Sequence, residues 1–520
     1  MVELIQQIDF LRGRVQRVEK ENDFLREQLR LLTAQLYGRK SERLPQGENP
    51  QLMLFDEPAG EVEVGEREEE VQETIAVPAH RRTRTGRKPL PENLPRVEIV
   101  HDVTEEEKRC GCGAVKSRIG EDVAEQLDVV PARVQVLRHI RPKYACRHCE
   151  GVEDNGPSVV IAPPPAQLIP KSMASAGLLA YILVGKFADA LPFYRQEGMF
   201  KRLGVEVNRT SMCNWSVQAG LACQPLLELL RKEIRSGPLI NIDETTVQVL
   251  NEPRRSPASK SYMWIFRGGV PDKPALEFFY YPGRDGKVAT DYLADYHGYV
   301  QTDGYIGYDF LDRRDTIVHL GCWAHVRRKF VDVLKAAGNL RSKKKTGVAE
   351  EAVDRIKALY DIEHAAREAK LDSDAIAKMR QEKAEPLIKS MHEWFLGLFR
   401  EVPPKSLLGK AISYALGQWP RLSHYLKDGR LRPDNNLAEN AIRPFVVGRK
   451  NWLFSGNAEG AQASATLYSL IETAKANKLE PYWYLRHVFE RLPLATTEED
   501  LRALLPQYID RNLIAITIPA

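Results

Sequence analysis

The N-terminal residues repeat apolar side chains at alternating spacings of four and three. This pattern runs from Leu4 to Leu36 and keeps one helical seam turned towards a partner helix. The polar residue in the seam is Asn22, at an a position, where a buried Asn favours a two-stranded, in-register coil. The flanking g and e positions carry opposite charges that attract across a parallel dimer: Arg14 with Glu19, and Glu21 with Arg26. The pattern predicts a dimerising coiled coil over residues 1–44; the alternative is an amphipathic helix packed on its own protein.

Residues 45–100 are predicted to be a linker, because their charge pattern replaces any apolar period. Residues 56–73 are acidic and punctuated by Pro and Gly, a composition typical of disordered segments. A basic segment follows, with five cations in eight residues: Arg81, Arg82, Arg84, Arg87 and Lys88. Such a segment suits contact with DNA phosphates or insertion into a minor groove, and it suits a solvated tether equally well.

Apolar residues take a helical spacing over residues 163–235. Within this region a first helix ends at a turn containing Gly204, and Asn208 is placed to cap a second helix. Two helices joined by a glycine turn resemble a helix-turn-helix, although such pairs are also common in helical domains generally. We predict a helical DNA-binding domain here, with Arg209 and Thr210 at the start of the second helix contacting DNA.

From residue 237 the pattern changes to short apolar strands separated by turns. In chain order we predict three strands, a helix, two strands and a helix: Leu239–Leu250, Tyr262–Arg267, Ala275–Tyr281, Lys287–Tyr296, Tyr299–Thr302, Thr316–Leu320 and Cys322–Ala337. This order is that of a ribonuclease-H-like α/β sheet, in which the first and fourth strands are neighbours. The fold class is therefore multidomain α+β. The predicted catalytic domain spans 236–470, contains a charged helical insertion at 338–430, and precedes a helical tail at 471–520.

Two aspartates follow from that strand order as candidate metal ligands. Asp243 lies on the first strand and Asp303 lies just past the fourth, so neighbouring strands bring them together. Two converging carboxylates can share divalent cations through oxygen ligands. The adjacent Glu244 is expected to point to the opposite face of its strand. Asp309 and Asp312 compete with Asp303 and are expected to be solvated loop acids.

The third acid of such a site has to come from a later helix. Glu439 lies one turn into a predicted helix that Asn435 or Asn436 can cap, and Arg443 follows four residues later on the same face. Helices are rich in glutamate, so a surface role is the competing interpretation. Basic and aromatic residues nearby suit DNA phosphate contact and stacking, although they also suit a solvated helix face: His325, Arg327, Arg328, Arg443, Arg449, Lys450 and Trp452.

Four of the seven cysteines form two close pairs with the spacing of metal ligands: Cys110, Cys112, Cys146 and Cys149. In a reducing compartment such pairs are typical of a four-thiolate Zn²⁺ site, which would close a domain at 101–162. The first pair is CxC, one residue shorter than usual. His148 replacing one cysteine and four incidental thiols are the alternatives. Residues 126–140, between the pairs, alternate as strands do.

Composition narrows the protein class further. The chain has 520 residues, 43% hydrophobic and 28% charged, which favours several globular domains and excludes collagen-like or wholly disordered chains. No apolar run is long enough to span a membrane, and the N-terminus lacks the pattern of a secretory signal. We expect a soluble cytoplasmic protein without a membrane partner, located at the bacterial nucleoid when bound to DNA.

Several ordered stretches match one known family: Tyr37–Glu42, Gln51–Asp56, Ile119–Asp128, Arg141–Cys146, Asp303–Tyr305, Cys322–Phe330, Asp434–Glu439 and Arg449–Phe454. Nearly end to end, the chain resembles the large, zinc-finger-containing transposase of the bacterial insertion sequence 66 family. The resemblance implies a DDE transposase, with a catalytic triad binding Mg²⁺ or Mn²⁺ at Asp243, Asp303 and Glu439. The CxC pair departs from the commoner CxxC, and the tail after Arg491 matches no known stretch.

The expected activity is cleavage of insertion-sequence ends and joining of their 3′ hydroxyls to target DNA by two-metal phosphoryl transfer. The expected partners are the terminal repeats, the target DNA and a second protomer in a homodimer or higher oligomer. Family members also work with small accessory transposition proteins. The alternatives are a structure-specific nuclease of the same fold and a non-catalytic DNA-binding regulator.

Overall fold

The computed structural model describes residues 134–145, 159–337 and 347–514. The predicted coiled coil, the linker with its basic segment, and all four predicted zinc-ligand cysteines lie outside these ranges. From Val136 onward, the described residues fall in one compact unit.

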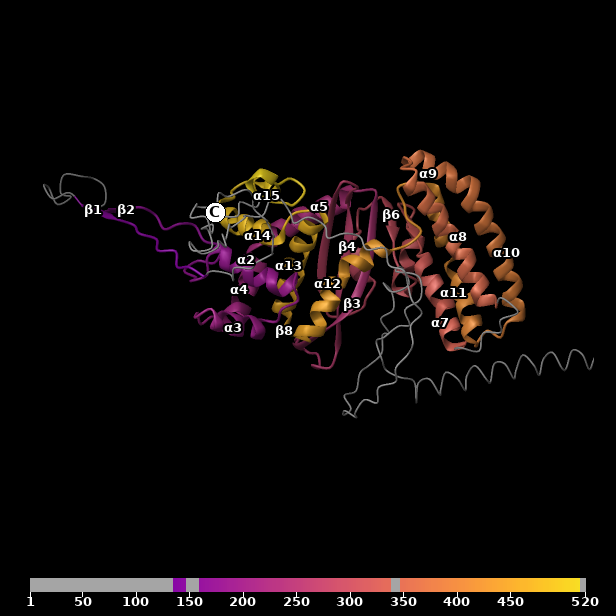
Figure 1. The fold of residues 1–520 in the computed structure, drawn as a ribbon, viewed down its shortest axis with the longest axis horizontal. Helices are drawn as coiled ribbons and strands as arrows, with labels where there is room; N and C mark the ends of the chain where they lie inside the picture. Colours follow the sequence, from indigo (N-terminus) through magenta and orange to yellow (C-terminus); the bar gives the residue numbers. More distant parts are fainter. Residues whose placement is uncertain (1–133, 146–158, 338–346, 515–520) are drawn as a thin grey trace, which may run out of the picture. The chain divides into compact units, whose positions relative to one another are not determined.

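A mixed sheet lies at the centre of this unit, with its helices packed around it (Figure 1). The strands are β3 (Leu239–Asn251), β4 (Lys260–Val270), β5 (Lys273–Tyr281), β6 (Gly298–Gln301), β7 (Ile317–Leu320) and β8 (Ser455–Asn457). The strand order is β5-β4-β3-β6-β7, and β8 pairs with β3. Strands β3, β4 and β5 are antiparallel, whereas β3, β6 and β7 run parallel. The five predicted strands are present to within a few residues, and the predicted pairing of the first with the fourth is confirmed.

Both faces of the sheet centre are covered. Successive side chains of a strand point to opposite faces, and the residues Met263 to Phe266 of β4 are all 0% exposed. A continuous apolar run of this kind is what a strand buried on both faces requires. The covering helices are α5 (Gln224–Ser236), α12 (Asn436–Trp452) and α13 (Ala458–Ala476), which contact β4, β3 and β5 respectively.

The outer edge of β5 is closed by hydroxyl groups of α13. The amide of Leu276 donates to Thr473 Oγ1 at 3.1 Å, and the amide of Phe278 donates to Ser469 Oγ at 2.8 Å. Ser469 and Thr473 are four residues apart, so one face of the helix presents both hydroxyls. An edge strand has unpaired amide groups that can recruit another strand. Here the helix takes these groups, which fixes α13 against the sheet.

The predicted pair of helices with a glycine turn is present. The helices before the sheet are α2 (Ala176–Phe187), α3 (Phe193–Arg202) and α4 (Arg209–Ala222). Asn208 caps α4, because its Oδ1 accepts a 2.8 Å hydrogen bond from the amide of Ser211. Gly204 in the turn has a φ of +78°, a conformation that glycine adopts without strain. Within the described ranges, no helix has both the length and the apolar character required to cross a membrane.

One hydrophobic core joins helices that the sequence divides among three predicted domains. Leu183 of α2, Ile240 of β3 and Leu485 of α14 (Pro481–Arg491) belong to the same buried cluster. Helix α13 also runs through the predicted boundary at residue 470. Shared packing of this kind depends on which apolar faces meet, and this information is absent from local periodicity. The last helix of this region is α15 (Glu498–Ala503).

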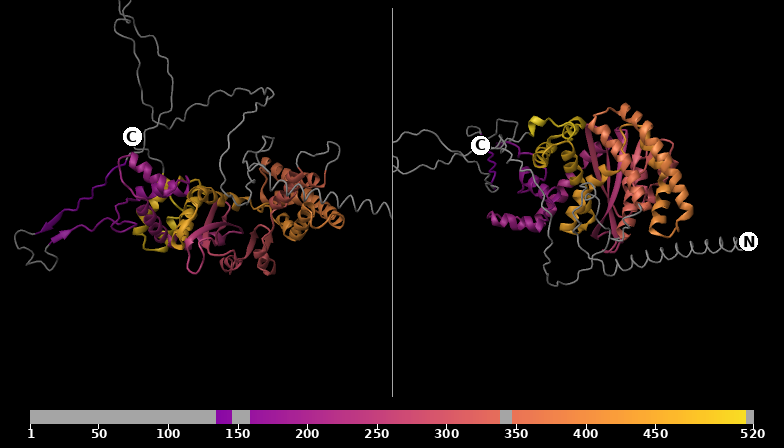
Figure 2. Two further views of the ribbon diagram at one scale, coloured as in Figure 1. Left: turned by 90° about the horizontal axis from the view of Figure 1, so that it is seen from below. Right: turned by 45° about the vertical axis from the view of Figure 1, so that its right-hand side comes forward.

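A second core lies among the helices between β7 and α12. These are α7 (Trp323–Ala337), α8 (Val348–Glu368), α9 (Ser373–Met379), α10 (Glu385–Glu401) and α11 (Leu407–Leu422), and they form one group in the views of Figures 1 and 2. Arg380 is 1% exposed. Its guanidinium pairs with Glu363 at 2.7 Å and donates to the carbonyls of Tyr425, Asp428 and Leu431. This one buried cation therefore fixes the segment by which the chain returns towards α12.

Two smaller expectations need correction. The helix α6 (Lys287–Tyr292) ends earlier than predicted. Residues 134–142, part of the stretch that alternates as strands do, form no strand, and the first strand, β1 (Lys143–Ala145), pairs with β2 (Val159–Ile161). Val136 is 92% exposed, so alternation in this stretch does not correspond to one buried face.

Candidate active site

Three buried amide side chains join the strands to the start of α12. Asn241 of β3 donates from Nδ2 to Gln301 Oε1 of β6 at 3.0 Å and to Asn435 Oδ1 at 3.0 Å. Asn435 in turn donates to the carbonyl of Ile242 at 2.8 Å. All three amides are at most 1% exposed. Buried polar groups of this kind hold a position firmly, since breaking one bond leaves an unpaired group behind.

Each amide precedes one of the predicted acids by two to four residues. Asn241 precedes Asp243, Gln301 precedes Asp303, and Asn435 precedes Glu439. The amide network thus determines where all three carboxylates leave the backbone.

The position predicted for the start of α12 is confirmed, but the capping hydrogen bond is not. Asn435 occupies the N-cap position without a side-chain capping bond, because its side chain points into the sheet. Asp434 Oδ1 instead accepts a 3.2 Å hydrogen bond from the amide of Asn436.

The carboxylates lie close enough to interact electrostatically. Burial raises the pKa of Asp243 well above its usual range, and the charges of Glu244, Glu439 and Asp303 raise it further. Like charges crowded into one buried place favour either a proton or a bound cation. The set of oxygen donors fits a hard divalent cation such as Mg²⁺ or Mn²⁺. The Oε1 atom of Glu439 is also buried without a hydrogen-bond partner.

Glu244 is a fourth acid that sequence reasoning missed. Strand alternation was expected to turn it away from Asp243, towards the other face. Its side chain is only 1% exposed and pairs with Arg284 at 2.5 Å, and it also accepts a hydrogen bond from Tyr308. Burial raises the pKa of Glu244, and so does the charge of Asp303. Glu244 therefore interacts with the acid cluster, and its Arg284 partner, 40 residues away, gave no local signal in the sequence.

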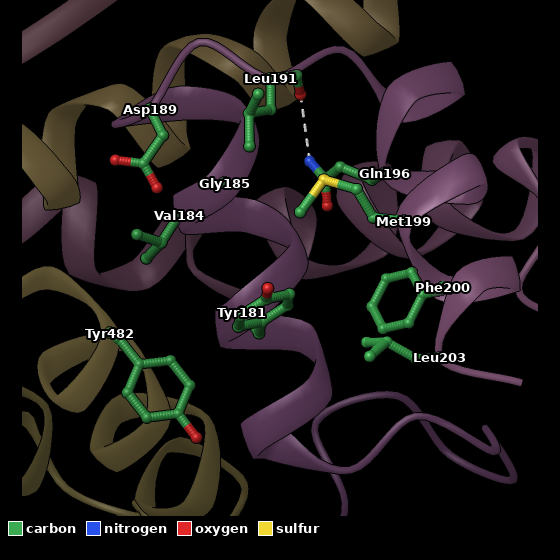
Figure 3. A pocket seen from close by; sticks show the side chains of 10 residues that line it. All are labelled: Tyr181, Val184, Gly185, Asp189, Leu191, Gln196, Met199, Phe200, Leu203 and Tyr482. Carbon is green, nitrogen blue, oxygen red and sulfur yellow. Dashed lines mark hydrogen bonds between the residues drawn. The ribbon is translucent and has the colours of Figure 1, made fainter. Parts of the chain in front are cut away.

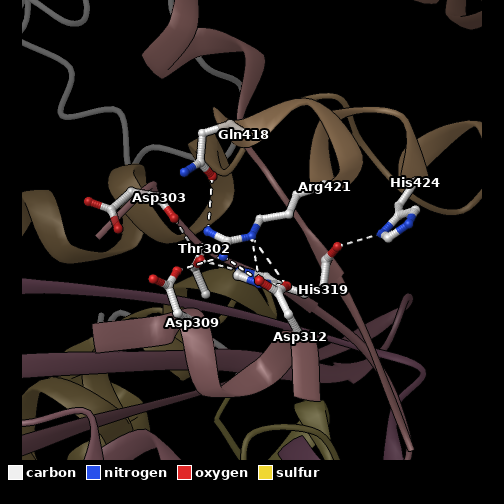
Figure 4. Close-up of polar contacts among 8 residues, drawn as sticks. All are labelled: Thr302, Asp303, Asp309, Asp312, His319, Gln418, Arg421 and His424. Atoms are coloured by element: carbon white, nitrogen blue, oxygen red, sulfur yellow. Dashed lines mark hydrogen bonds and ion pairs between the residues drawn. The ribbon is translucent and has the colours of Figure 1, made fainter. Parts of the chain in front are cut away.

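The competing aspartates have other partners (Figure 4). Asp309 pairs with Arg421 of α11 at 2.6 Å, and Asp312 pairs with the same guanidinium. Asp312 also contacts His319 Nδ1 at 2.8 Å, and His319 Nε2 lies 2.8 Å from Thr302 Oγ1. These two acids were expected to be solvated. They instead form ion pairs between the loop after β6 and α11, and the backbone just before Asp303 is tied to them.

Glu439 faces two cations of α7. His325 Nδ1 is 3.5 Å from Glu439 Oε1, and an Arg328 guanidinium nitrogen is 3.3 Å from Oε2. Cys322, immediately before α7, completes a group whose ligand atoms all lie within 4.8 Å of one another: Cys322, His325 and Glu439. Burial raises the pKa of Cys322 and lowers that of His325. The Cys-x-x-His spacing was visible in the sequence, but its meeting with Glu439 was not.

The remaining predicted DNA contacts are spread over several elements. Arg209 and Thr210 at the start of α4 are exposed, as are Arg443 and Lys450 on α12, whereas Arg327 on α7 is half-buried. Arg449 donates to Thr245 Oγ1 at 3.1 Å and Thr246 Oγ1 at 3.0 Å, which joins α12 to β3. Trp452 packs edge-on against Phe445 at 5.4 Å. The structure thus brings the predicted acids together but gives Arg449 and Trp452 packing contacts within the protein.

A cavity of about 270 Å³ lies apart from the acids (Figure 3). Its walls come from α2, the turn after it, α3 and Tyr482 of α14, and they are mainly apolar. None of the predicted site residues lines it. It therefore belongs to the packing around the helix pair.

Comparison with known proteins identifies the class. The family model described as Transposase IS66 family matches residues 171–463, and the IS66 C-terminal element matches 469–507. The zinc-finger binding domain of transposase IS66 matches 107–150, which contains all four predicted zinc-ligand cysteines. A further model, Transposase C of IS166 homeodomain, matches 24–99, across the junction of the predicted coiled coil and linker.

Relatives come from Sinorhizobium fredii (strain NBRC 101917 / NGR234). The uncharacterized protein y4qI is 33% identical over 493 residues, covering 92% of this chain and 87% of its own length. The uncharacterized protein y4jD is 36% identical over 433 residues, covering 80% and 81%. The chain belongs to the IS66 transposase family, which confirms the resemblance. Family membership implies DNA as a partner, a divalent metal in the transposase domain and zinc in the zinc-finger domain.

The amide network generates a stability prediction. Asn435→Ala removes the donor to Ile242 and the acceptor of Asn241, leaving buried polar groups unpaired. We expect it to lower the free energy of unfolding by roughly 2–4 kcal/mol, at about 1–3 kcal/mol for each unpaired group. Urea denaturation measures this loss. The control is Asn436→Ala, next in sequence and more exposed, which should cost less than about 1 kcal/mol; equal losses would mean that the network holds nothing.

Crowding of the carboxylates generates the opposite prediction for Asp243→Asn. A raised pKa means that the folded state binds more protons than the unfolded state, so the penalty is absent at acid pH and grows as pH rises. In metal-free buffer at pH 8 the variant should be more stable than the parent by about 1 kcal/mol or more, since one pKa unit is worth ~1.4 kcal/mol. The gain should shrink towards pH 5. Asp315→Asn, at an exposed position, is the control; a destabilised Asp243→Asn protein would contradict the argument.

Proposed function

We propose that this protein cleaves insertion-sequence ends and joins the 3′ hydroxyls to target DNA, as a DDE transposase with a ribonuclease-H-like catalytic fold. The fold proposal is supported by the strand order β5-β4-β3-β6-β7, with the first three strands antiparallel and the last two parallel to β3. The activity rests on one observation above all. Asp243, Asp303 and Glu439, from β3, the end of β6 and α12, approach closely enough for their charges to raise the pKa of Asp243.

These three carboxylates would hold the divalent cations, Mg²⁺ or Mn²⁺. Bound there, the cations would supply activation of the attacking oxygen and stabilisation of the leaving oxygen. The protein's own contribution is positional. Asp243 is held at the sheet by the hydrogen bond from the Glu244 amide to its Oδ1, at 2.9 Å, and Asp303 Oδ1 accepts a matching bond from the Tyr305 amide, at 2.9 Å. Fixed carboxylates reduce the reorganisation that the reaction requires.

The cations next to the acids have a different role. Arg284 pairs with Glu244, and Arg328 pairs with Glu439. Each neutralises one outer acid, so the buried Asp243 retains the uncompensated charge that attracts metal. Arg328 is 34% exposed at its side chain and can also contact a DNA phosphate beside the site.

DNA would be held by exposed cations on several elements. We propose that α3 and α4 act as a helix-turn-helix, with Arg209 and Thr210 at the N-terminal end of the second helix. Arg443 and Lys450 lie on the same helix as Glu439 and would contact the strand being cut. The basic segment at residues 81–88, four zinc-bound cysteines and a dimerising N-terminal coil belong to the same proposal. A dimer suits an enzyme that has to hold two element ends, with or without accessory proteins.

An assay of end cleavage in Mg²⁺ separates the candidate functions. A transposase cuts matched terminal repeats, leaves scrambled ones and joins the released 3′ ends to a second DNA. A structure-specific nuclease would ignore the repeat sequence. A DNA-binding regulator would bind matched ends without cutting them.

Glu439→Gln tests the third acid directly. The change keeps size and hydrogen bonding but removes the charge that a cation requires. We expect strand transfer to fall about a thousandfold or more, which corresponds to ~4 kcal/mol at ~1.4 kcal/mol per tenfold change in rate. End binding should change less than about tenfold, because phosphate contacts by other residues remain. Strand-transfer and gel-shift assays on matched ends measure the two quantities.

The matched control is Glu459→Gln, at an exposed position in the first turn of the neighbouring helix α13. It should retain activity. A fully active Glu439→Gln protein would exclude Glu439 from the triad.

A further inference from the structure

We propose that Cys322, His325 and Glu439 form a binding site for one divalent transition-metal ion of the Zn²⁺ class. The site rests on the proposed function only in sharing Glu439 with the proposed Mg²⁺ ligands. Its other two ligands are outside the carboxylate set.

The three residues converge from two helix starts. Cys322 immediately precedes α7, His325 lies in its first turn, and Glu439 lies in the first turn of α12. Their ligand atoms all lie within 4.8 Å of one another. A tetrahedral ion with ligand distances of about 2.0–2.3 Å places ligand atoms roughly 3.3–3.7 Å apart. Each side chain would therefore move by less than about 1 Å to reach this geometry.

Two of the ligand atoms are buried and lack a hydrogen-bond partner. These are His325 Nδ1 and Glu439 Oε1. Leaving a buried polar atom unpaired costs about 1–3 kcal/mol, so two such atoms facing one another require an explanation. The other carboxylate oxygen, Oε2, is near Arg328, which leaves Oε1 available on the side of His325. A metal ion between these atoms would satisfy both.

The sulfur is oriented for a negatively charged state. Cys322 is 4% exposed, and its Sγ accepts a 3.2 Å hydrogen bond from the amide of Asn435. A neutral thiol is a weak acceptor, whereas a metal-bound thiolate is a strong one and is commonly stabilised by outer hydrogen bonds. Asn435 belongs to the buried amide network, so this donor is held in place. The same network would therefore support both Glu439 and the sulfur ligand.

The chemistry of the ligands selects the ion. Thiolate and imidazole favour Zn²⁺ and similar ions over Mg²⁺, which takes oxygen ligands. Three protein ligands leave a fourth position open, as in zinc sites that bind water or substrate. Such an ion would join the first turns of α7 and α12 and fix the orientation of the Glu439 carboxylate. The residue pair Cys322 and His325 then acts on Glu439 by positioning it.

Metal content of the full-length protein tests the proposal. The zinc-finger domain contributes the same zinc to every variant, so the measured quantity is the difference between variants. Elemental analysis after dialysis should find one more zinc per chain in the parent than in Cys322→Ser or His325→Gln. With Co²⁺ in place of Zn²⁺, the thiolate-to-cobalt absorption should decrease in Cys322→Ser by the contribution of one sulfur. Cys213→Ser, at an exposed cysteine on α4, is the matched control and should lose nothing.

Each outcome decides the question. Equal zinc in the parent, Cys322→Ser and His325→Gln would overturn the proposal and leave a metal-free polar cluster. If Cys322→Ser fails to fold, His325→Gln carries the same comparison without removing the buried sulfur. Asp243→Asn separates this inference from the proposed function: it should abolish strand transfer while keeping the additional zinc. An active Asp243→Asn protein would refute the catalytic proposal alone.

Discussion

The buried contact of Asn241 with Gln301 and Asn435 is the constraint on which the candidate site depends. It connects two adjacent parallel strands with the start of a helix that follows almost 200 residues later in the chain. Because the three amides are nearly inaccessible to water, each hydrogen bond lost would leave an unpaired polar group in the interior. The backbone positions of Asp243, Asp303 and Glu439 follow from this contact, and so does the amide that faces Cys322.

The acids are brought together against their own repulsion. The fold compensates Glu244 with Arg284 and Glu439 with Arg328, but Asp243 has only a backbone amide to accept from. Part of the free energy gained by packing is therefore used to keep a charged cluster in place without a cation. Binding of a divalent ion would relieve this repulsion and stabilise the folded state through linkage. Such an arrangement trades stability for function, a common property of active sites.

The sequence predicts the local elements of this fold well and its long-range contacts poorly. Strand periodicity located β3 to β7, and the cap by Asn208 followed from residue type and spacing alone. Both depend on interactions within a few residues. The side chain of Asn435 could not be placed in this way, because a capping residue and a residue reaching into a sheet look alike in sequence. Glu244 failed for the same reason, since Arg284 and Tyr308 approach it from segments 40 and 64 residues away.

The helical insertion explains how acids so distant in sequence meet. It lies between α7 and α12, and it returns the chain to the sheet through the segment that buried Arg380 holds by three backbone carbonyls. At the end of this segment, the Trp323 amide donates to the carbonyl of Pro433 at 2.9 Å, and Gln301 donates to that of Arg432 at 2.9 Å. The first turns of α7 and α12 are consequently fixed to each other before any ligand is bound. The insertion therefore contributes to the position of Glu439 through its base, whatever its outer helices contact.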